Sequence, residues 1–336
     1  MAGSRVVRPV LVTGGAGYVG SHACKRLAAA GYTPVTLDSL ENGHRRLVRW
    51  GPLEVGDLRD ADRVNAVVGH YAPVAVLHFA AYAYVGESMR DPGRYYRNNV
   101  GGTVNLLDAM VDHGVERLVF SSTCATFGTP DRVPITENHP QSPINPYGAS
   151  KLMVERILRD YDQIHGLRSI ALRYFNAAGA DPDGETGERH LPETHLIPLA
   201  MDAALGEGPP LEVYGDDYPT ADGSCVRDYV HVSDLADAHV GALTHLEAGS
   251  HSTAFNLGTG TGSSVFEVLD QVRTTTGRDL EVHIRGRREG DPAELVADAG
   301  RASEGLGWRP RRSKLADIVG DAWQWRISAR RAALPG

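Results

Sequence analysis

The sequence has few cysteines, no long apolar run and no excess of positive charge. Its three cysteines, Cys24, Cys124 and Cys225, are far apart and form no CxxC pair. This pattern excludes a disulfide framework and a cysteine zinc site, and it favours a reducing compartment. No apolar run approaches the length that crosses a bilayer, and residues 1–9 lack the apolar segment of a signal peptide. We therefore expect a cytoplasmic protein with no membrane partner.

The charge balance is acidic, with a net charge of -8 at pH 7. Nucleic-acid binding needs clustered Lys and Arg, so no nucleic-acid partner is expected. A phosphate ligand is still compatible with this charge, because the backbone N–H groups of a helix N-terminus can bind it. The length of 336 residues, with 42% hydrophobic and 23% charged residues, indicates a globular protein of two lobes.

Short apolar segments alternate with helical segments in the first half of the chain. We expect strands at residues 9–13, 33–38, 53–55, 74–79, 117–121 and 169–174, and helices at 21–30, 104–113 and 151–164. Short, continuously apolar strands separated by helices are typical of a parallel sheet covered on both faces. The pattern predicts an α/β fold with a doubly wound parallel sheet of the Rossmann type.

The second half changes in character. Residues 177–198 are rich in Gly, Pro, Asp and Glu, and we expect a mobile loop over a site there. Strands expected at 211–214, 255–257 and 280–284 mix with helices and indicate a smaller C-terminal α/β substrate lobe. The expected domains are a dinucleotide-binding domain at 1–176 and a substrate domain at 177–336. Some segments of the second domain are expected to return to the first.

A glycine-rich segment, residues 14–20 (GGAGYVG), follows the first expected strand and opens the first helix. In this context the glycines allow the backbone to approach a pyrophosphate, and the helix dipole favours its negative charge. Asp38 ends the second strand, where a carboxylate accepts hydrogen bonds from an adenosine ribose. A 2′-phosphate there would meet a like charge, at a cost of up to ~4 kcal/mol. NAD is thus favoured, while Arg45 and Arg46 keep NADP open.

Tyr147 and Lys151 lie four residues apart on an expected helix, hence on one face. A free phenol has a pKa near 10, so proton transfer near neutrality needs a shift of roughly three units, or about 4 kcal/mol. An ammonium about 4 Å away supplies energy of that order at an effective dielectric of about 20. Together with the glycine loop, the pair predicts a general base and acid beside a dinucleotide.

Residues 120–128 end a strand with a group of hydroxyls. At the carboxyl edge of a parallel sheet, one of these hydroxyls is placed to bond a reacting sugar hydroxyl; the alternative is that they cap the next segment. With these features, residues 12 to about 325 resemble the UDP-galactose (UDP-glucose) 4-epimerase family of extended short-chain dehydrogenase/reductases. The segments that carry the resemblance are residues 12–20, 78–88, 147–151, 173–179, 217–222, 227–232 and 287–291.

The resemblance implies a role for each matching residue. Tyr147 is the base, Lys151 its partner and holder of the nicotinamide ribose, and Thr123 the catalytic hydroxyl. Asp57 is placed to reach the adenine, with a turn or N-cap role as the alternative. The implied NAD-binding residues are Gly14, Gly17, Tyr18, Val19, Gly20, Asp38, Asn42, Asp57, Leu58, Phe79, Ala80, Asn99, Ser122, Tyr147, Lys151 and Tyr174. The implied substrate residues are Thr123, Tyr147, Asn176, His195, Leu196, Tyr214, Arg227, Tyr229, Arg288, Asp291 and Leu295. No metal ligand is expected.

Within the substrate set, Asn176, Arg227 and Arg288 are expected to hold the diphosphate and ribose, Tyr214 to pack on the uracil, and Asp291 to bind its ribose. Four positions depart from the family pattern. Thr123 stands where Ser is common and keeps the hydroxyl. Phe127 replaces a Tyr, and Ala83 replaces a Lys near the cofactor phosphates. Leu295 stands where a bulky Tyr excludes N-acetylated sugars and a smaller residue admits them, so the substrate range is left open.

The predicted reaction is inversion at C4 of a UDP-sugar. Tyr147 takes the 4-hydroxyl proton while C4 gives hydride to NAD, the 4-keto sugar rotates, and hydride returns to the other face. A 4,6-dehydratase is the first alternative, but its Asp-Glu pair is replaced here by Cys124 and Ala125. Another NAD-dependent nucleotide-sugar oxidoreductase and a dinucleotide-sensing regulator are the others.

The sugar itself is not determined by these residues. UDP-glucose and UDP-galactose are the default pair, with UDP-N-acetylhexosamines and UDP-pentoses open. A homodimer through the helices at 104–113 and 151–164 is expected from the resemblance.

Overall fold

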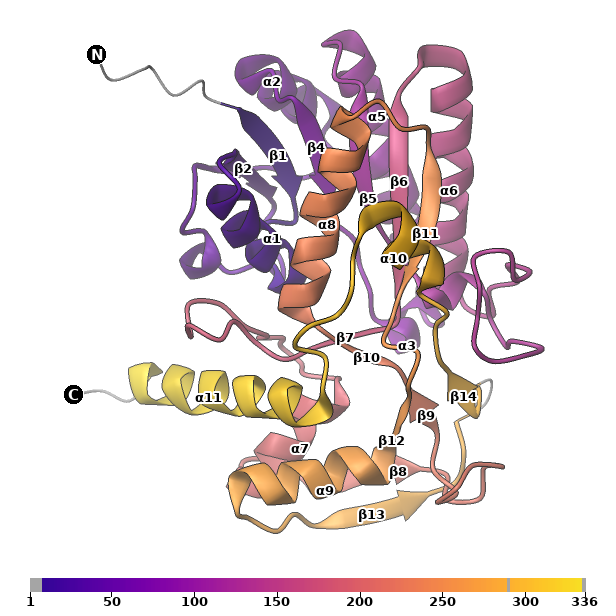
Figure 1. Cartoon of the computed structure of the whole chain (residues 1–336). Helices are drawn as coiled ribbons and strands as arrows, with labels where there is room; N and C mark the ends of the chain where they lie inside the picture. The colour runs from indigo at the N-terminus through magenta and orange to yellow at the C-terminus, as the bar shows by residue number, and fades with distance from the viewer. Residues whose placement is uncertain (1–7, 289–290, 334–336) are drawn as a thin grey trace. The chain divides into compact units, whose positions relative to one another are not determined.

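The computed structural model describes residues 8–288 and 291–333 (Figure 1). Two of the expectations from the sequence concern, in part, residues outside these ranges. Residues 1–7 of the N-terminal segment, for which no signal peptide is expected, lie outside the described residues. So do Glu289 and Gly290 within the family segment 287–291.

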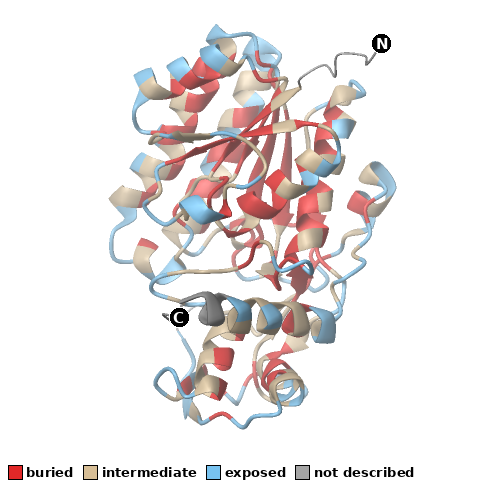
Figure 2. Ribbon diagram, turned by 90° about the vertical axis from the view of Figure 1, so that its left-hand side faces the viewer, coloured by how far each residue is buried: buried red, intermediate tan, exposed pale blue. Residues whose placement is uncertain are grey.

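A seven-stranded sheet has the strand order β11–β6–β5–β4–β1–β2–β3. The pairs β1–β2, β2–β3, β1–β4 and β4–β5 are all parallel, and Figure 2 shows the strands as largely buried. This confirms the predicted Rossmann-type sheet. Its strands are β1 (Pro9–Thr13), β2 (Thr33–Asp38), β3 (Leu53–Val55), β4 (Ala75–His78), β5 (Arg117–Thr123), β6 (Arg168–Tyr174) and β11 (Thr253–Leu257).

Two groups of helices flank the sheet. Helices α2, α5 and α6 pack side by side, while an ion pair between Arg26 and Asp237 joins α1 to α8, which crosses in front of the sheet in Figure 1. The helices are α1 (Tyr18–Ala29), α2 (Ala61–Tyr71), α3 (Val85–Ser88), α4 (Pro92–Tyr95), α5 (Gly102–Asp112), α6 (Pro146–His165) and α8 (Val232–Glu247). Three further turns are the 3-10 helices η1 (Arg45–Leu47) and η3 (Cys124–Thr126) and the π-helix η2 (Tyr96–Gly101).

The chain divides into two compact units. The first contains the chain before Thr123, together with Asn145–Leu172 and Ala236–Ala254. The second contains Thr123–Ile144, Arg173–Leu235 and the chain after Ala254. The core of the first unit is formed by apolar strand residues and the inner faces of α2, α5 and α6.

Within its described residues, the second unit has three small sheets: β7–β10, β8–β13 and β12–β9–β14. Their strands are β7 (Asn176–Ala178), β8 (Leu211–Tyr214), β9 (Val226–Arg227), β10 (Tyr229–His231), β12 (Ser263–Ser264), β13 (Val282–Arg285) and β14 (Glu294–Leu295). Helices α7 (Leu196–Leu205), α9 (Val265–Thr276) and α11 (Leu315–Ala333) enclose its main core, and α10 (Gly300–Leu306) follows β14.

The expected loop at residues 177–198 is wrong at both of its ends. Residues 177 and 178 belong to β7, which pairs in parallel with β10, and Ala178 is buried. Leu196 begins α7, whose Ile197 is also buried. Small and apolar residues at the ends of this polar segment therefore form core elements, because strand pairing and burial outweigh the polar composition of the middle.

Several other element boundaries also moved. Helix α1 begins at Tyr18, directly after the glycine turn, and α6 begins at Pro146, before both predicted catalytic residues. Strand β13 is Val282–Arg285, two residues later at its start than expected. The expected helices and strands are otherwise present within two or three residues, as is usual where ends are set by capping contacts.

Candidate active site

The glycine turn joins β1 to α1 and leaves no space for side chains. Gly14 has a left-handed φ of +73°, and a Cβ there would lie 2.7 Å from the Ala80 nitrogen. A Cβ on Gly20 would lie 2.2 Å from the Gly14 carbonyl oxygen. Helix α1 has no acidic residue in its first turn and no side chain capping it among the described residues. Its N-terminal N–H groups therefore suit a pyrophosphate, as NAD binding requires.

The turn lies where the order of the sheet reverses. Strand β1 has β2 on one side and β4 on the other, and Thr13 is the register partner of His78 at the ends of β1 and β4. Ligands of open α/β sheets bind at this switch point, beyond the carboxyl ends of the strands. Phe79 and Ala80 follow β4 directly, so both predicted cofactor residues lie at this edge.

His78 holds the two strands together as a neutral ring. Its Nδ1 lies 2.7 Å from the Thr13 hydroxyl and its Nε2 lies 2.9 Å from the Thr103 hydroxyl. Burial, reinforced by the positive charge of Lys151, lowers the pKa of His78 to about 3. A neutral imidazole has one donor and one acceptor, and both nitrogens are used here.

Asp38 ends β2 beside the glycine turn. Its Oδ2 accepts a hydrogen bond of 3.0 Å from the Ala16 nitrogen, and its Oδ1 accepts one of 2.8 Å from the Leu40 nitrogen. Burial raises the pKa of Asp38, and these hydrogen bonds oppose the rise. A carboxylate has about four lone-pair positions, so the group retains capacity for two ribose hydroxyls.

The other predicted adenosine contacts differ in character. The Asp57 carboxylate is bound by the Arg59 guanidinium and accepts a hydrogen bond of 2.8 Å from the Arg59 nitrogen. The structure thus gives Asp57 the turn role that was its alternative. Arg45 and Arg46, the residues that kept NADP open, lie exposed in η1.

Tyr147 and Lys151 both lie on α6, so their expected placement on one helix is confirmed. The helix begins there because Asn145 caps it: its Oδ1 accepts a hydrogen bond of 2.8 Å from the Gly148 nitrogen, and Pro146 occupies the first turn. Tyr147 is half-buried in that first turn, whereas Lys151 is buried.

The Lys151 amine has a fixed position. Its Nζ donates a hydrogen bond of 2.8 Å to the Ser121 carbonyl oxygen and lies 4.8 Å from the centre of the Phe120 ring. Burial lowers the pKa of Lys151 to about 7, against the opposing charge of Glu155. Burial therefore makes this ammonium easier to deprotonate than that of an exposed lysine.

Asn99 and Ser150 connect this helix to the π-helix η2. Asn99 Nδ2 donates to the Ser150 hydroxyl at 3.1 Å and to the Tyr82 carbonyl at 3.0 Å. Its Oδ1 accepts from the Tyr82 nitrogen at 2.9 Å. Asn99 is predicted to line the cofactor; here its side chain positions the segment beside Lys151. Sequence reasoning found no role for Ser150.

The structure places nearly all predicted cofactor residues in the first unit. Those at the glycine turn or at the carboxyl end of a strand are Gly14, Gly17, Tyr18, Val19, Gly20, Asp38, Phe79, Ala80 and Ser122. Asn42 is exposed after β2 and Leu58 is buried after β3. Tyr174 ends β6 and belongs to the second unit.

Thr123 is the last residue of β5 and begins the second unit. Its buried hydroxyl oxygen accepts a hydrogen bond of 3.1 Å from the Ala125 nitrogen and so caps the short helix η3. The alternative capping role is therefore present. That bond uses one lone pair of the hydroxyl and does not involve its proton.

All predicted substrate residues except Tyr147 belong to the second unit. Arg227 and Asp291 form an ion pair in which the Arg227 side chain is 11% exposed. The Arg288 guanidinium lies over the Tyr214 ring, 3.9 Å from its centre. These four residues therefore form two pairs, each with one arginine. The arginines suit a diphosphate, and the tyrosine ring suits an aromatic base.

The strand register connects further members of this set. Leu295 of β14 is the register partner of Arg227, and its side chain packs on the apolar cluster that contains Phe127. Asn176 of β7 is the register partner of Tyr229, which is buried. His195 and Leu196 lie at the start of α7, where the His195 Nδ1 forms an ion pair with Glu188.

Asp228 is a residue that sequence reasoning missed. It is buried, and its carboxylate accepts hydrogen bonds from the nitrogens of Thr259 (2.8 Å), Gly260 (3.2 Å) and Ala297 (3.1 Å). It follows Arg227 and fixes the strands that carry Arg227 and Leu295. Its partners lie more than thirty residues away, so only its position in segment 227–232 pointed to it.

The comparisons with known proteins define the class of protein. The model of the NAD dependent epimerase/dehydratase family matches residues 10–258. The chain belongs to this family. It is 55% identical over 316 residues to the UDP-glucose 4-epimerase of Rhizobium leguminosarum bv. trifolii, covering 94% of this chain and 96% of that relative.

Two solved structures support the same conclusion. UDP-glucose 4-epimerase from Brucella ovis in complex with NAD has 54% sequence identity and a TM-score of 0.93, over 95% of this chain and 98% of that one. UDP-glucose-4-epimerase from Stenotrophomonas maltophila, with bound NAD and formylated UDP-arabinopyranose, has 42% identity and a TM-score of 0.93. That match covers 97% of this chain and 100% of the other.

The predicted family, enzyme class and cofactor, a UDP-glucose 4-epimerase that uses NAD, are thereby confirmed. Among the described residues, no helix has the length and apolarity of a membrane span.

Proposed function

We propose that the chain interconverts UDP-glucose and UDP-galactose, with Tyr147 as the group that moves the proton of the sugar 4-hydroxyl. The observation that carries this proposal is the helix α6 pair. Tyr147 lies in its first turn, and Lys151 is held one turn later on the Ser121 carbonyl. Tyr147 is a half-buried phenol, one helical turn from a buried lysine whose pKa is lowered to about 7. A phenol and a lysine in this arrangement can act together as a general base.

The mechanism assigns each step to a residue of this chain. Tyr147 accepts the proton of the 4-hydroxyl and returns it after the sugar has rotated. Lys151, in its ammonium form, stabilises the phenolate by charge. The Thr123 hydroxyl, at the end of β5, is proposed to hydrogen-bond the sugar oxygen. NAD, when bound, supplies the reversible oxidation at C4.

The substrate handle is proposed to be the UDP moiety. Arg227 and Arg288 bind the diphosphate, Tyr214 packs on the uracil and Asp291 binds the ribose. Binding would exchange the Arg227–Asp291 ion pair for contacts of each residue with the ligand. Because these anchors hold the nucleotide rather than the sugar, the 4-keto sugar is free to rotate, as inversion at C4 requires.

The division of labour between the units is also a proposal. NAD binding is assigned to the first unit and UDP binding to the second. These units differ from the expected domains at 1–176 and 177–336, because residues 123–144 and 173–176 belong to the second unit. The segment Ala236–Ala254 belongs to the first unit, and we propose it as a segment that returns to the NAD-binding part of the chain.

The experiment that tests the proposed function is the variant Tyr147→Phe. We expect kcat for UDP-galactose epimerisation to fall by about 10²–10⁴-fold, the contribution of a positioned acid–base group. NAD content should stay at the wild-type level. Tyr161→Phe is the matched control, because its phenol lies on the same helix but bonds the exposed Asp108. Near wild-type turnover of Tyr147→Phe with NAD bound would reject the mechanism.

The two residues after Thr123 disfavour the dehydratase alternative. The residues after Thr123 are Cys124 and Ala125, and burial raises the pKa of the Cys124 thiol to about 12. A protonated thiol and a methyl group cannot abstract a proton at C5. An oxidoreductase that exchanges its cofactor is separated by measuring NADH released during turnover, which an epimerase does not release.

A homodimer is proposed through α5 and α6. Helix α6 exposes two large apolar side chains: Met153 is 46% exposed and Ile164 is 73% exposed. Light scattering on the wild type and on Ile164→Glu tests this interface, and a monomeric wild type would reject it. The expected cytoplasmic location likewise stays a proposal, based on the absence of disulfide-type cysteine spacing.

A further inference from the structure

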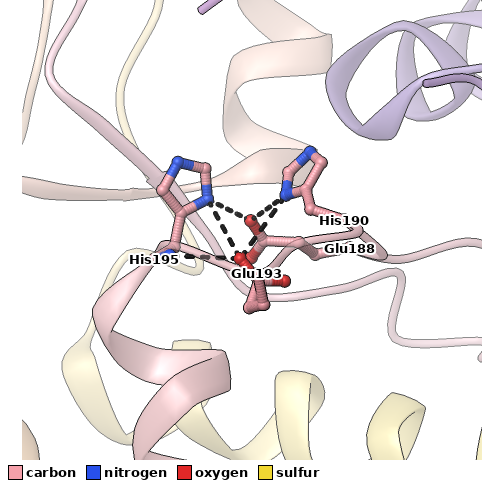
Figure 3. Close-up of side chains that lie close together, drawn as sticks. All are labelled: Glu188, His190, Glu193 and His195. Atoms are coloured by element: carbon pink, nitrogen blue, oxygen red, sulfur yellow. Dashed lines mark hydrogen bonds and ion pairs between the residues drawn. The ribbon is translucent and has the colours of Figure 1, made fainter. Parts of the chain in front are cut away.

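Four side chains converge in the segment between β7 and α7: Glu188, His190, Glu193 and His195, called here the Glu-His cluster (Figure 3). Each offers one ligand atom, and these four atoms all lie within 4.8 Å of one another. The spacing E-x-H-x2-E-x-H matches neither a helix nor a strand, so the sequence pattern alone gave no sign of it. The fold of the segment creates the cluster.

The distances suit a small metal ion. His190 Nδ1 lies 3.1 Å from Glu188 Oε1 and 3.6 Å from Glu193 Oε1. His195 Nδ1 lies 3.9 Å from Glu193 Oε1 and is paired with Glu188 Oε1. In a tetrahedral zinc site with bonds of about 2.0–2.1 Å, neighbouring ligand atoms lie about 3.3–3.4 Å apart. Three of the four imidazole–carboxylate distances, from 3.1 to 3.9 Å, are close to this spacing.

The cluster is also largely withdrawn from water. The side chains of Glu188, Glu193 and His190 are 8%, 11% and 18% exposed, and that of His195 is 50% exposed. The ligand oxygens of the two carboxylates lie within 4.8 Å of each other. Two largely buried carboxylates this close repel each other and need a compensating positive charge. Two imidazolium rings, with ring centres 5.2 Å apart, would supply it in the absence of a metal. One divalent cation bound by two neutral imidazoles would supply the same two positive charges.

The segment is anchored on the C-terminal helix of the same unit. Trp325 Nε1 of α11 donates a hydrogen bond of 2.9 Å to the Glu188 carbonyl oxygen. Gly187 lies against the same indole, so closely that a Cβ there would be 2.4 Å from it. The position of Glu188 is therefore determined by packing, and the site is preorganised.

We infer that Glu188, His190, Glu193 and His195 bind one divalent transition-metal ion of the Zn²⁺ type. Two imidazole nitrogens and two carboxylate oxygens form a donor set that suits zinc better than magnesium or calcium, which prefer oxygen alone. The nearby acidic group Asp181, Asp183 and Glu185 has only oxygen donors and is not part of this site.

The site has a consequence for substrate binding, which rests on the proposed function. A metal on His195 Nδ1 leaves the ring proton on Nε2. In Figure 3 the Nε2 side of the ring points away from the cluster. His195 would then offer a permanent N–H donor beside Leu196, in the segment predicted to contact the substrate.

The test measures metal directly. Untagged full-length protein is dialysed against metal-free buffer and analysed by mass spectrometry for bound metals. The wild type should carry about one zinc ion per chain, as one four-ligand site requires. Glu188→Gln and His190→Gln should each carry less than about a tenth of that, since removal of a ligand costs at least the 10–100-fold in affinity that supporting contacts are worth. Asp183→Asn, in the same segment, is the matched control and should retain zinc.

A second measurement protects the test from misfolded variants. Chelator-treated wild type is titrated with Co²⁺, and a tetrahedral site should give intense visible absorption that Glu193→Gln lacks, with circular dichroism showing both proteins folded. Wild type that binds neither zinc nor cobalt stoichiometrically overturns the inference. So does zinc retained at the wild-type level in both Glu188→Gln and His190→Gln. Tyr147→Phe should keep wild-type zinc, so failure of the proposed function and failure of the metal site are separable.

Discussion

The hydroxyl of Ser122 donates a hydrogen bond of 2.6 Å to Oε1 of Glu155, and both side chains are buried. Glu155 lies four residues after Lys151 on α6, hence on the same face. Burial lowers the pKa of Lys151, and the charge of Glu155 raises it. Ser122 is predicted to line the cofactor, but its hydroxyl proton is committed to Glu155. The pair therefore acts on the chemistry through Lys151.

Glu155→Gln should move the whole pH profile of kcat to lower pH. Loss of a nearby negative charge makes the Lys151 ammonium easier to deprotonate and the Tyr147 phenolate easier to form, so both limbs shift in the same direction. The profile is measured from pH 5 to 10. Asp160→Asn on the exposed side of α6 is the control and should leave the profile in place. A profile of Glu155→Gln that superimposes on wild type contradicts this positioning role.

Lys151→Met should change how stability depends on pH. The folded pKa of Lys151 is about 7, below the ordinary value of 10.5. Between these values the unfolded chain binds the proton and the folded chain does not, so wild-type stability rises with pH. The free energy of unfolding of wild type minus that of Lys151→Met should therefore increase by up to ~1.4 kcal/mol per pH unit above pH 7.

Urea unfolding of both proteins at pH 7, 8 and 9 checks this slope. Lys314→Met, at an exposed lysine, is the matched control. A constant difference between wild type and Lys151→Met over this range would show that the amine does not titrate there. Lys151→Met should also lose epimerase activity, because the phenolate loses its charge partner.

Asp38→Asn should reduce the preference for NAD over NADP. The carboxylate repels a 2′-phosphate, at a cost of up to ~4 kcal/mol, and its removal should lower the ratio of the two dissociation constants at least 10-fold. Titration calorimetry with both cofactors measures this ratio. Asp62→Asn, an exposed carboxylate of α2, should leave it unchanged. If Asp38→Asn binds the two cofactors with the wild-type ratio, the discrimination comes from another residue.

Leu295→Ala should widen the substrate range. Leu295 packs on the cluster that contains Phe127, and its truncation opens space opposite Arg227. The ratio of kcat/KM for UDP-N-acetylgalactosamine to that for UDP-galactose should rise about 10-fold or more, the effect of a few methylene groups in a pocket. Ile284→Ala, at an exposed position of β13, is the control. If Leu295→Ala leaves this ratio unchanged, Leu295 does not line the sugar pocket.

The features that were predictable from the sequence are those with local causes. The glycine turn, Asp38 and the spacing of Tyr147 and Lys151 each follow from backbone geometry or helical periodicity within about twenty residues. The buried groups were not predictable in the same way. Asn99 bonds Ser150, fifty-one residues later, and Asp228 bonds Ala297, sixty-nine residues later.

The boundaries of the polar segment illustrate the same limit. Composition alone indicated a loop over residues 177–198, but β10, which begins fifty-three positions after β7 does, provides the pairing that makes β7 a strand. The Glu-His cluster is the converse case. Its members are close in sequence, yet the anchor that fixes them is Trp325. Tertiary partners therefore decided both outcomes.

Strand β11 is synthesised long after β6, the strand with which it pairs. It pairs with β6 at the edge of the seven-stranded sheet but is formed by Thr253–Leu257, about three-quarters of the way along the chain. While the ribosome makes the 78 residues between β6 and β11, the outer edge of β6 has no partner strand and is open to pairing with another chain. A nascent chain released before Thr253 would keep that edge permanently, and we expect such fragments to aggregate instead of folding into an independent nucleotide-binding domain.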